Sequence, residues 1–283
     1  EPVRVEVHPP RRGMERHMGR KTNRVLITGA AGGIGTSLRG LLRGAYPELV
    51  LSDRAAPADL APGERFVQAD LCDLAQVEAI CEGVDGIVHL GGRSVEDSWE
   101  EIHPANIVGC YNIFEAARRK KVKRIVFASS NHVMGFYRQC DVVDAHSPPR
   151  PDGLYGLSKA FGEDLSRLYF DRFGIETACV RIGSSFPEPV DRRMLATWLS
   201  HDDLHRLIVA CLTTPVLGHS IIYGTSNNRV SWYDNRHARH IGFVPQDSSD
   251  RFRAAIYERT AEPDVKDPTV LYQGGGFVRL GEF

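Results

Sequence analysis

A tyrosine and a lysine separated by one helical turn are the pair in this sequence best suited to proton transfer. They are Tyr155 and Lys159, in the stretch RPDGLYGLSKAFGED at residues 150–164. A phenol has an unperturbed pKa of about 10 and is a poor base at neutral pH, but a neighbouring ammonium stabilises the phenolate and lowers that pKa. The same spacing also suits two amphipathic side chains at the solvated edge of any helix, so the pair gains meaning only with further residues.

A serine followed by two polar residues precedes this segment. The run FASSNH ends a strand predicted over residues 124–130 and carries Ser130, Asn131 and His132. The Ser130 hydroxyl can hold a substrate oxygen while its proton moves, and Lys159 can also reach a nicotinamide ribose. We therefore predict that Ser130, Tyr155 and Lys159 carry out catalysis.

A glycine-rich turn indicates a dinucleotide site. The run LITGAAGGIG follows the first predicted strand and opens the first helix, where glycines permit a tight turn and free N–H groups can bind a pyrophosphate. Asp53 ends the second predicted strand, where a carboxylate accepts hydrogen bonds from the adenosine ribose and repels a 2′-phosphate, which favours NAD over NADP. The structural alternative is a plain strand–helix turn with Asp53 as a solvated strand end. The predicted cofactor contacts are Gly29, Gly32, Gly33, Ile34, Gly35, Asp53, Asp70, Leu71, Leu90, Gly91, Gly92 and Lys159.

Strands and helices alternate along the chain from residue 23. This alternation predicts an α/β protein with a Rossmann-type doubly wound parallel sheet and a small C-terminal substrate-binding subdomain. We expect strands at 23–29, 48–53, 65–70, 85–92, 124–130, 176–183 and 220–224, and helices at 35–45, 74–83, 105–120, 201–214 and around Tyr155. The predicted parts are a flexible N-terminal extension at 1–22, the NAD-binding core with the catalytic residues at 23–184, and a substrate-binding portion packed on the same domain at 185–283.

Composition argues against several other classes of protein. The chain has 283 residues, of which 42% are hydrophobic, and a formal net charge of −1, which gives no reason to expect nucleic acid or a membrane as a partner. The six cysteines are never closer than nine residues, so no Cys-x-x-Cys motif occurs and a reduced, cytoplasmic protein is expected. His201 and His205 have a spacing that can hold a metal, but no third ligand is indicated, and no metal is predicted.

Together these motifs resemble the extended short-chain dehydrogenase/reductases. They occur in the order of a Thr28-Gly29-x-x-Gly32-x-x-Gly35 turn, an acid after the second strand, and Ser130 placed 25 residues before Tyr155. Within that superfamily the chain is similar to the uronate dehydrogenases, through HLGGRSVE, RIVFASSNH, RPDGLYGLSK, VRIGSSFPEP, RMLATWLSHDDL and YQGGGFV. The resemblance implies NAD-dependent oxidation of D-galacturonate or D-glucuronate at the anomeric carbon to the aldarolactone, with Tyr155 as the general base.

The resemblance also implies a substrate-binding set in the loops that follow the strands. A hexuronate presents one carboxylate and several hydroxyls, and Arg193 can bind the carboxylate bidentately, while Ser185 is expected at the nicotinamide. The structural alternatives are a surface ion pair for Arg193, a loop role for His132, and capping roles for Asn131 and Ser94. The predicted substrate contacts are Ser94, Ser130, Asn131, His132, Tyr155, Ser184 and Arg193.

Two other functions are compatible with the same motifs. One is a sugar-nucleotide epimerase or dehydratase that keeps NAD tightly bound, although the chain after residue 184 is short for a nucleotide-diphosphate pocket. The other is a non-catalytic NAD-binding sensor, which has no need of the complete Ser130, Tyr155 and Lys159 set. Arg93 departs from the family pattern, and if its guanidinium pointed inward it would either alter substrate preference or add a second carboxylate contact. Family analogy favours a homo-oligomer.

Overall fold

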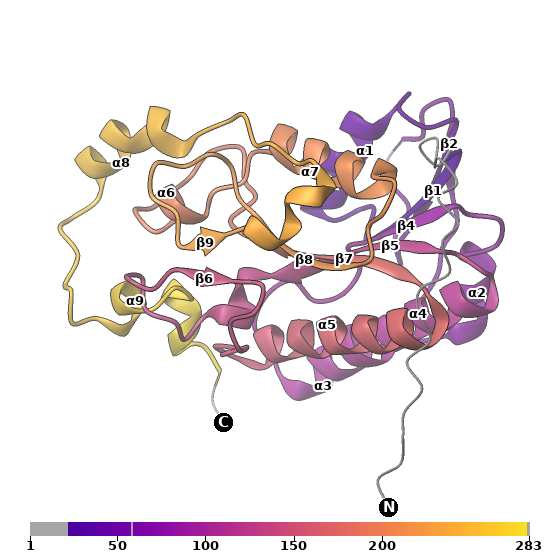
Figure 1. The fold of residues 1–283 in the computed structure, drawn as a ribbon, viewed down its shortest axis with the longest axis horizontal. Helices are drawn as coiled ribbons and strands as arrows, with labels where there is room; N and C mark the ends of the chain where they lie inside the picture. The colour runs from indigo at the N-terminus through magenta and orange to yellow at the C-terminus, as the bar shows by residue number, and fades with distance from the viewer. Residues whose placement is uncertain (1–21, 58, 282–283) are drawn as a thin grey trace, which may run out of the picture.

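Seven parallel strands form the central sheet of this computed structural model, which describes residues 22–57 and 59–281 (Figure 1). Their order across the sheet is β3-β2-β1-β4-β5-β7-β8, which confirms the predicted Rossmann-type α/β fold. The strands are β1 (Arg24–Thr28), β2 (Glu48–Ser52), β3 (Glu64–Phe66), β4 (Gly86–His89), β5 (Arg124–Ser130), β7 (Glu176–Ile182) and β8 (His219–Gly224). The predicted N-terminal extension lies outside the described residues, apart from Thr22.

Helices cover both faces of the sheet (Figure 1). One face carries α1 (Gly33–Leu42) and α7 (His201–Thr213). The other face carries α2 (Leu74–Ile80), α4 (Gly109–Arg119) and α5 (Leu154–Phe173). The two layers follow from the alternation of strands and helices, because each crossover between parallel strands places its helix on one face or the other.

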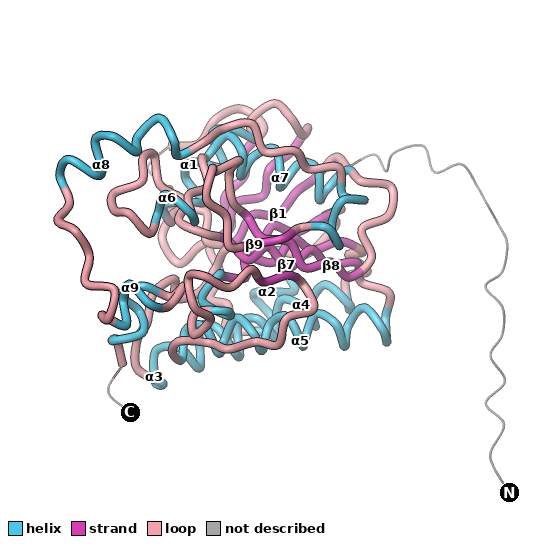
Figure 2. The backbone as a smooth tube through the Cα atoms, turned by 60° about the vertical axis from the view of Figure 1, so that its left-hand side comes forward, coloured by secondary structure: helices cyan, strands magenta, loops and turns pink. Residues whose placement is uncertain are grey.

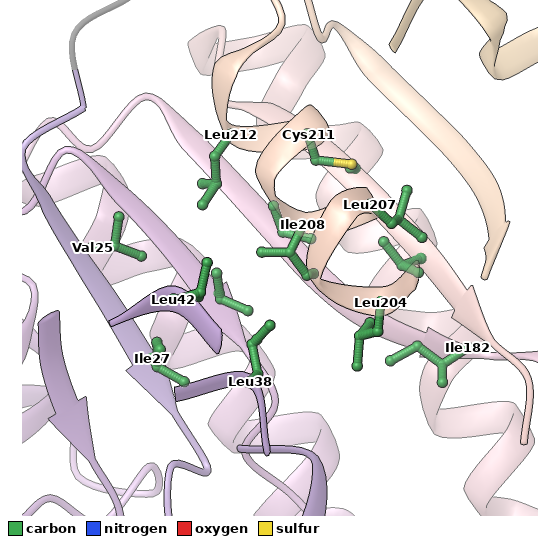
Figure 3. Packing of buried hydrophobic residues seen from close by; sticks show 14 of the residues in the cluster. Val25, Ile27, Leu38, Leu42, Ile182, Leu204, Leu207, Ile208, Cys211 and Leu212 are labelled. Carbon is green, nitrogen blue, oxygen red and sulfur yellow. The ribbon is translucent and has the colours of Figure 1, made fainter. Parts of the chain in front are cut away.

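Alternate residues of each central strand point into opposite helical layers. In β1, Val25 and Ile27 belong to a buried cluster that includes residues of α1 and α7, whereas Leu26 belongs to a second cluster with residues of α2 and α4. Figure 3 shows the first cluster, in which Leu38 and Leu42 of α1 lie beside Val25 and Ile27. Because both faces are buried, the strand is a continuous apolar run in the sequence.

The helix predicted over residues 105–120 begins differently from the prediction. A short helix, α3 (Trp99–Ile102), runs into a π-helical turn, η1 (His103–Val108), before α4 begins at Gly109. Pro104 in this turn has no N–H to donate to a regular helical ladder. The turn carries Asn106, whose side chain contacts the loop after β4 and the serine before Lys159.

The chain after β7 contributes to two parts of the fold. Its elements α7 and β8 complete the layers of the Rossmann core. Figure 2 shows the short helices α6, α8 and α9, with the long loops that connect them, on one side of the molecule. The remaining elements are η2 (Asn131–Met134), β6 (Val143–Asp144), α6 (Met194–Thr197), β9 (Tyr233–Asp234), η3 (Arg236–Ile241), η4 (Ser249–Phe252), α8 (Arg253–Arg259), α9 (Pro268–Leu271) and η5 (Gly275–Arg279).

Candidate active site

The glycine turn between β1 and α1 has the geometry of an anion-binding site. Gly29 has a φ of +68°, and a Cβ built there would lie 2.8 Å from the backbone nitrogen of Gly91. The N-cap residue of α1, Gly32, provides no side-chain cap, and the first turn of the helix contains no acidic residue. The N–H groups at this helix end therefore suit a bound pyrophosphate, and the glycines let it approach the backbone.

The predicted adenosine contacts surround this turn. Asp53 follows β2, and its Oδ2 accepts a hydrogen bond at 3.0 Å from the backbone N–H of Ala31, which holds the carboxylate beside the turn. Asp70 is exposed, while the Leu71 side chain packs over Gly91. Asn112 of α4, which the sequence reasoning missed, donates to the Leu71 carbonyl at 2.8 Å and thereby holds this loop. The residues around the glycine turn are therefore compatible with the adenosine part of NAD.

Ser130, Tyr155 and Lys159 lie at the carboxyl end of the sheet and are all buried. Ser130 is the last residue of β5, and Tyr155 and Lys159 occupy successive turns at the start of α5. The Lys159 ammonium lies over two aromatic rings, 5.6 Å from the ring centroid of Tyr155 and 5.3 Å from that of Phe127. The structure thus brings together the three predicted catalytic residues.

The prediction that Lys159 lowers the pKa of Tyr155 is wrong for the protein alone. Burial raises the pKa of Tyr155 to about 12, an effect that the Ser130 hydroxyl only partly opposes. Burial also lowers the pKa of Lys159 to about 8. Both shifts have the same cause, since removal from water disfavours the charged form of each group. The low solvation of the site therefore outweighs the stabilisation that Lys159 was expected to give the phenolate.

A glutamate missed by the sequence reasoning caps the start of α5. The two carboxylate oxygens of Glu96 accept hydrogen bonds from the backbone N–H groups of Leu154 and Tyr155, each at 2.9 Å. Glu96 belongs to the loop after β4, and it lies 58 residues before Leu154 in the sequence. A carboxylate is favourable at a helix N-terminus, because it satisfies free N–H groups and complements the helix dipole.

His132 and Asn131 are both buried, and the His132 ring packs against the Tyr155 ring. The His132 Nδ1 lies 2.7 Å from Asp152 Oδ2, and its ring stacks on Phe277 with ring centroids 3.7 Å apart. Asn131 donates through Nδ2 to the Tyr233 hydroxyl at 3.3 Å. The sequence reasoning identified neither Asp152 nor Phe277 as functional, although both belong to the stretches RPDGLYGLSK and YQGGGFV that carry the family resemblance.

Arg193 is directed into the protein and not into a surface ion pair. Its Nε donates to the Gln273 carbonyl at 2.6 Å, and its Nη2 is buried without a hydrogen-bond partner among the residues that the structure describes. Its charge acts on His132, whose pKa is lowered first by burial and then further by Arg193. A buried, unpaired guanidinium nitrogen costs free energy unless a ligand accepts from it, and a carboxylate is its best partner.

The other predicted contacts fall into different environments. The Ser184 and Thr197 hydroxyls are 2.8 Å apart and already bond to one another, whereas the Ser185 Oγ is buried without a partner in the described part of the chain. Ser94 is exposed on the same loop as Glu96. Arg93 forms ion pairs with Asp97 and Glu101 at the surface, so its guanidinium does not point inward.

The remaining sequence motifs show no further site. The Ser200 hydroxyl accepts a hydrogen bond at 2.9 Å from the backbone N–H of Asp203, as a cap of α7. Among residues 22–57 and 59–281, no group of three or more His, Cys, Asp or Glu side chains is arranged to hold a metal ion. Over the same ranges, no helix combines the length and the apolar character needed to cross a membrane.

Comparison with known proteins agrees with this geometry. The profile of the NAD dependent epimerase/dehydratase family matches residues 25–219. A uronate dehydrogenase of Pseudomonas putida is 55% identical over 262 residues, which cover 92% of this chain and 97% of the relative. The chain belongs to the uronate dehydrogenase family.

Solved structures of this family superpose closely on the chain. A mutant of the uronate dehydrogenase from Agrobacterium tumefaciens in complex with NAD has a TM-score of 0.90 and 49% identity, and the match covers 92% of this chain and 98% of that one. A glucuronic acid dehydrogenase from Chromohalobacter salexigens has a TM-score of 0.91 at 49% identity, with the same coverage of 92% and 98%. As a member of the uronate dehydrogenase family, this chain is an NAD-dependent oxidoreductase, as the sequence motifs predicted.

Proposed function

We propose that the chain oxidises a hexuronate, D-galacturonate or D-glucuronate, at the anomeric carbon and forms the aldarolactone. The observation that carries this proposal is the buried, unpaired Nη2 of Arg193. A neutral sugar offers this nitrogen no charged partner, whereas the carboxylate of a uronate does. The family relationship supports the same substrate class, since the relatives are named for uronate or glucuronic acid.

In the proposed reaction, Tyr155 accepts the proton of the anomeric hydroxyl and Ser130 holds the same oxygen. NAD, when bound, supplies the acceptor for the hydride that leaves the anomeric carbon. Lys159 binds the nicotinamide ribose, and its ammonium places a positive charge near the phenol. Ser185 contacts the nicotinamide amide. Because the pKa of Tyr155 is about 12 in the protein alone, ionisation of the phenol needs the positive charges of the assembled site.

The remaining substrate contacts are proposed for the hydroxyls of the sugar. They are Ser94, Asn131, His132 and Ser184, together with Ser130 and Tyr155 at the reacting oxygen. We also propose that residues 23–184 provide the main NAD-binding surface and the catalytic groups, and that residues 185–283 contribute Arg193 and the Ser185 contact to the nicotinamide. We also propose a homo-oligomer located in the cytoplasm.

A spectrophotometric assay tests the proposed reaction. Purified protein, NAD and either uronate should produce the absorbance of NADH, and the initial product should be a lactone that opens to the aldaric acid. No NADH with either sugar would overturn the proposal. An epimerase predicts a different result, in which NAD stays bound through purification and no net reduction occurs.

A further inference from the structure

A buried carboxylate behind His132 has no place in the reaction described above. The Asp152 side chain has an exposed fraction of 0%, and its Oδ2 bonds to His132 Nδ1 at 2.7 Å. Its other oxygen, Oδ1, is buried and has no hydrogen-bond partner among residues 22–57 and 59–281. Burying a carboxylate with so little compensation is destabilising. Its presence beside a predicted substrate contact therefore indicates a function.

Two glycines from separate parts of the chain make room for this carboxylate, and a third, Gly156, lies beside it. A Cβ built on Gly135 or Gly274 would overlap Asp152 Oδ2, and one built on Gly156 would lie 3.2 Å from Oδ1. Gly135 has a φ of −58° and Gly274 a φ of −64°, which any residue can adopt. The contact with Asp152, and not the backbone conformation, is what requires glycine at these two positions.

Among the residues that the structure describes, the imidazole of His132 is hydrogen-bonded at one edge only. Phe277 stacks on one face, and the Tyr155 ring packs edge-on with centroids 5.9 Å apart. Burial lowers the pKa of His132; Asp152 and Glu96 oppose this effect, and Arg193 adds to it. The lowered pKa favours the neutral ring, which carries a proton on one nitrogen only.

The hydrogen bond between His132 Nδ1 and Asp152 Oδ2 indicates which nitrogen carries that proton. An ionised carboxylate only accepts hydrogen bonds, so Nδ1 must carry the hydrogen and Nε2 must keep its lone pair. Within the described chain, His132 bonds through Nδ1, and no hydrogen bond of Nε2 is present. The edge of the ring that faces away from Asp152 is thus a hydrogen-bond acceptor.

We propose that Asp152 is a positioning residue that holds His132 in the tautomer protonated at Nδ1, so that Nε2 accepts a hydrogen bond from a hydroxyl of the substrate sugar. This inference rests on the proposed function, since it takes the sugar hydroxyls as the donors. It also adds a determinant of specificity: a sugar that lacks this hydroxyl leaves a built acceptor unpaired, and sites that hydrogen-bond a hydroxyl reject the deoxy analogue strongly.

Nitrogen NMR of the NAD-bound protein tests the tautomer directly. With ¹⁵N-labelled histidine, and with His132→Gln to identify the resonances, we expect His132 to carry its proton on Nδ1 at neutral pH. In Asp152→Asn the Nδ1–H form should lose population, because an amide can also donate to Nδ1. A wild-type His132 protonated at Nε2 would overturn the inference. The measurement needs no turnover, so failure of the tautomer assignment and failure of the proposed uronate oxidation are detected separately.

Kinetics separate positioning from a merely structural contribution. Asp152→Asn should raise the KM for galacturonate about tenfold or more, with a smaller change in kcat and an unchanged Kd for NAD. In a His132→Gln background the same substitution should add less than about twofold, because its effect passes through the imidazole. Losses that multiply in the double variant would instead show a structural effect and overturn the proposal.

Two glycine variants provide a matched pair for the same test. Gly274→Ala places a methyl group against Asp152 Oδ2 and should reproduce the rise in KM. Gly276→Ala lies in the same segment, where an added Cβ meets no atom within 4 Å, and should behave as the wild type. A wild-type KM in a folded Gly274→Ala would count against the positioning of His132 by Asp152.

Discussion

Replacing Arg193 tests the link between the structure and the choice of substrate. In Arg193→Met the unbranched stem is retained and the guanidinium is lost. The buried Nη2 is the group without a partner, while Nε is already bonded to the Gln273 carbonyl at 2.6 Å. In the variant the bound substrate therefore lacks one charge-assisted hydrogen bond. Such a bond contributes about 1.5–3 kcal/mol to binding. That free energy corresponds to a loss of about 10- to 150-fold in kcat/KM for galacturonate.

The assay compares a charged sugar with an uncharged one. The KM for D-galacturonate should rise in Arg193→Met, whereas the inhibition constant of D-galactose against the same substrate should change by less than about threefold. Arg192→Met is the matched control, because Arg192 bonds to Thr260 and Glu262 and not to the site. Equal weakening of both sugars, or the same loss in the control, would refute the carboxylate role of Arg193.

Four further substitutions test other parts of the site. Tyr155→Phe should lower kcat by at least about 100-fold while the Kd for NAD, measured by fluorescence, stays within about twofold; retained turnover would exclude the tyrosine as the base. Asp53→Ala should reduce the ratio of kcat/KM for NAD to that for NADP, and an unchanged ratio would contradict the ribose contact. Glu96→Gln leaves one of two helix N–H groups without its carboxylate acceptor and should lower the free energy of unfolding in urea by about 1–2 kcal/mol; Glu100→Gln, an exposed change in α3, is the control. Burial lowers the pKa of His89 to about 3, so below pH 6.5 the unfolded chain takes up a proton that the folded one does not, and stability falls as the pH falls. The stability advantage of the wild type over His89→Asn should therefore shrink by roughly 1.5 kcal/mol between pH 6.5 and 5.0, and a constant difference would show that His89 is not buried neutral.

Much of the fold followed from patterns that are local in the sequence. The apolar runs at 48–53 and 124–130 became buried parallel strands, because a strand covered on both faces must be apolar at successive positions. The glycine turn, Asp53, and the spacing of Ser130, Tyr155 and Lys159 were also recognisable, since each depends on residue type at a short spacing or at a strand end. The parallel sheet then brings these strand ends to one edge.

Other features had no local signal. The π-helical turn at His103–Val108 was not predicted, and it carries Asn106, whose side chain bonds to the backbone N–H of Arg93 in the loop after β4. Glu96 resembles any loop glutamate in the sequence, and its capping of α5 depends on a contact across 58 residues. The pKa of Tyr155 was predicted in the wrong direction for the protein alone, because spacing indicates the neighbour Lys159 but not the loss of water around both groups.

The amino-acid sequence alone predicted the fold class and the uronate dehydrogenase family correctly, and it pointed to the glycine turn and to Ser130, Tyr155 and Lys159, which the fold brings to one edge of the sheet. It could not show which polar groups become buried, or against what. Asp152 stands three residues before Tyr155 and looks like a turn residue, yet Gly135, Gly156 and Gly274 enclose it against His132. Burial and orientation arise from contacts between distant segments, and these contacts determine the solvation and the hydrogen bonding of each polar group.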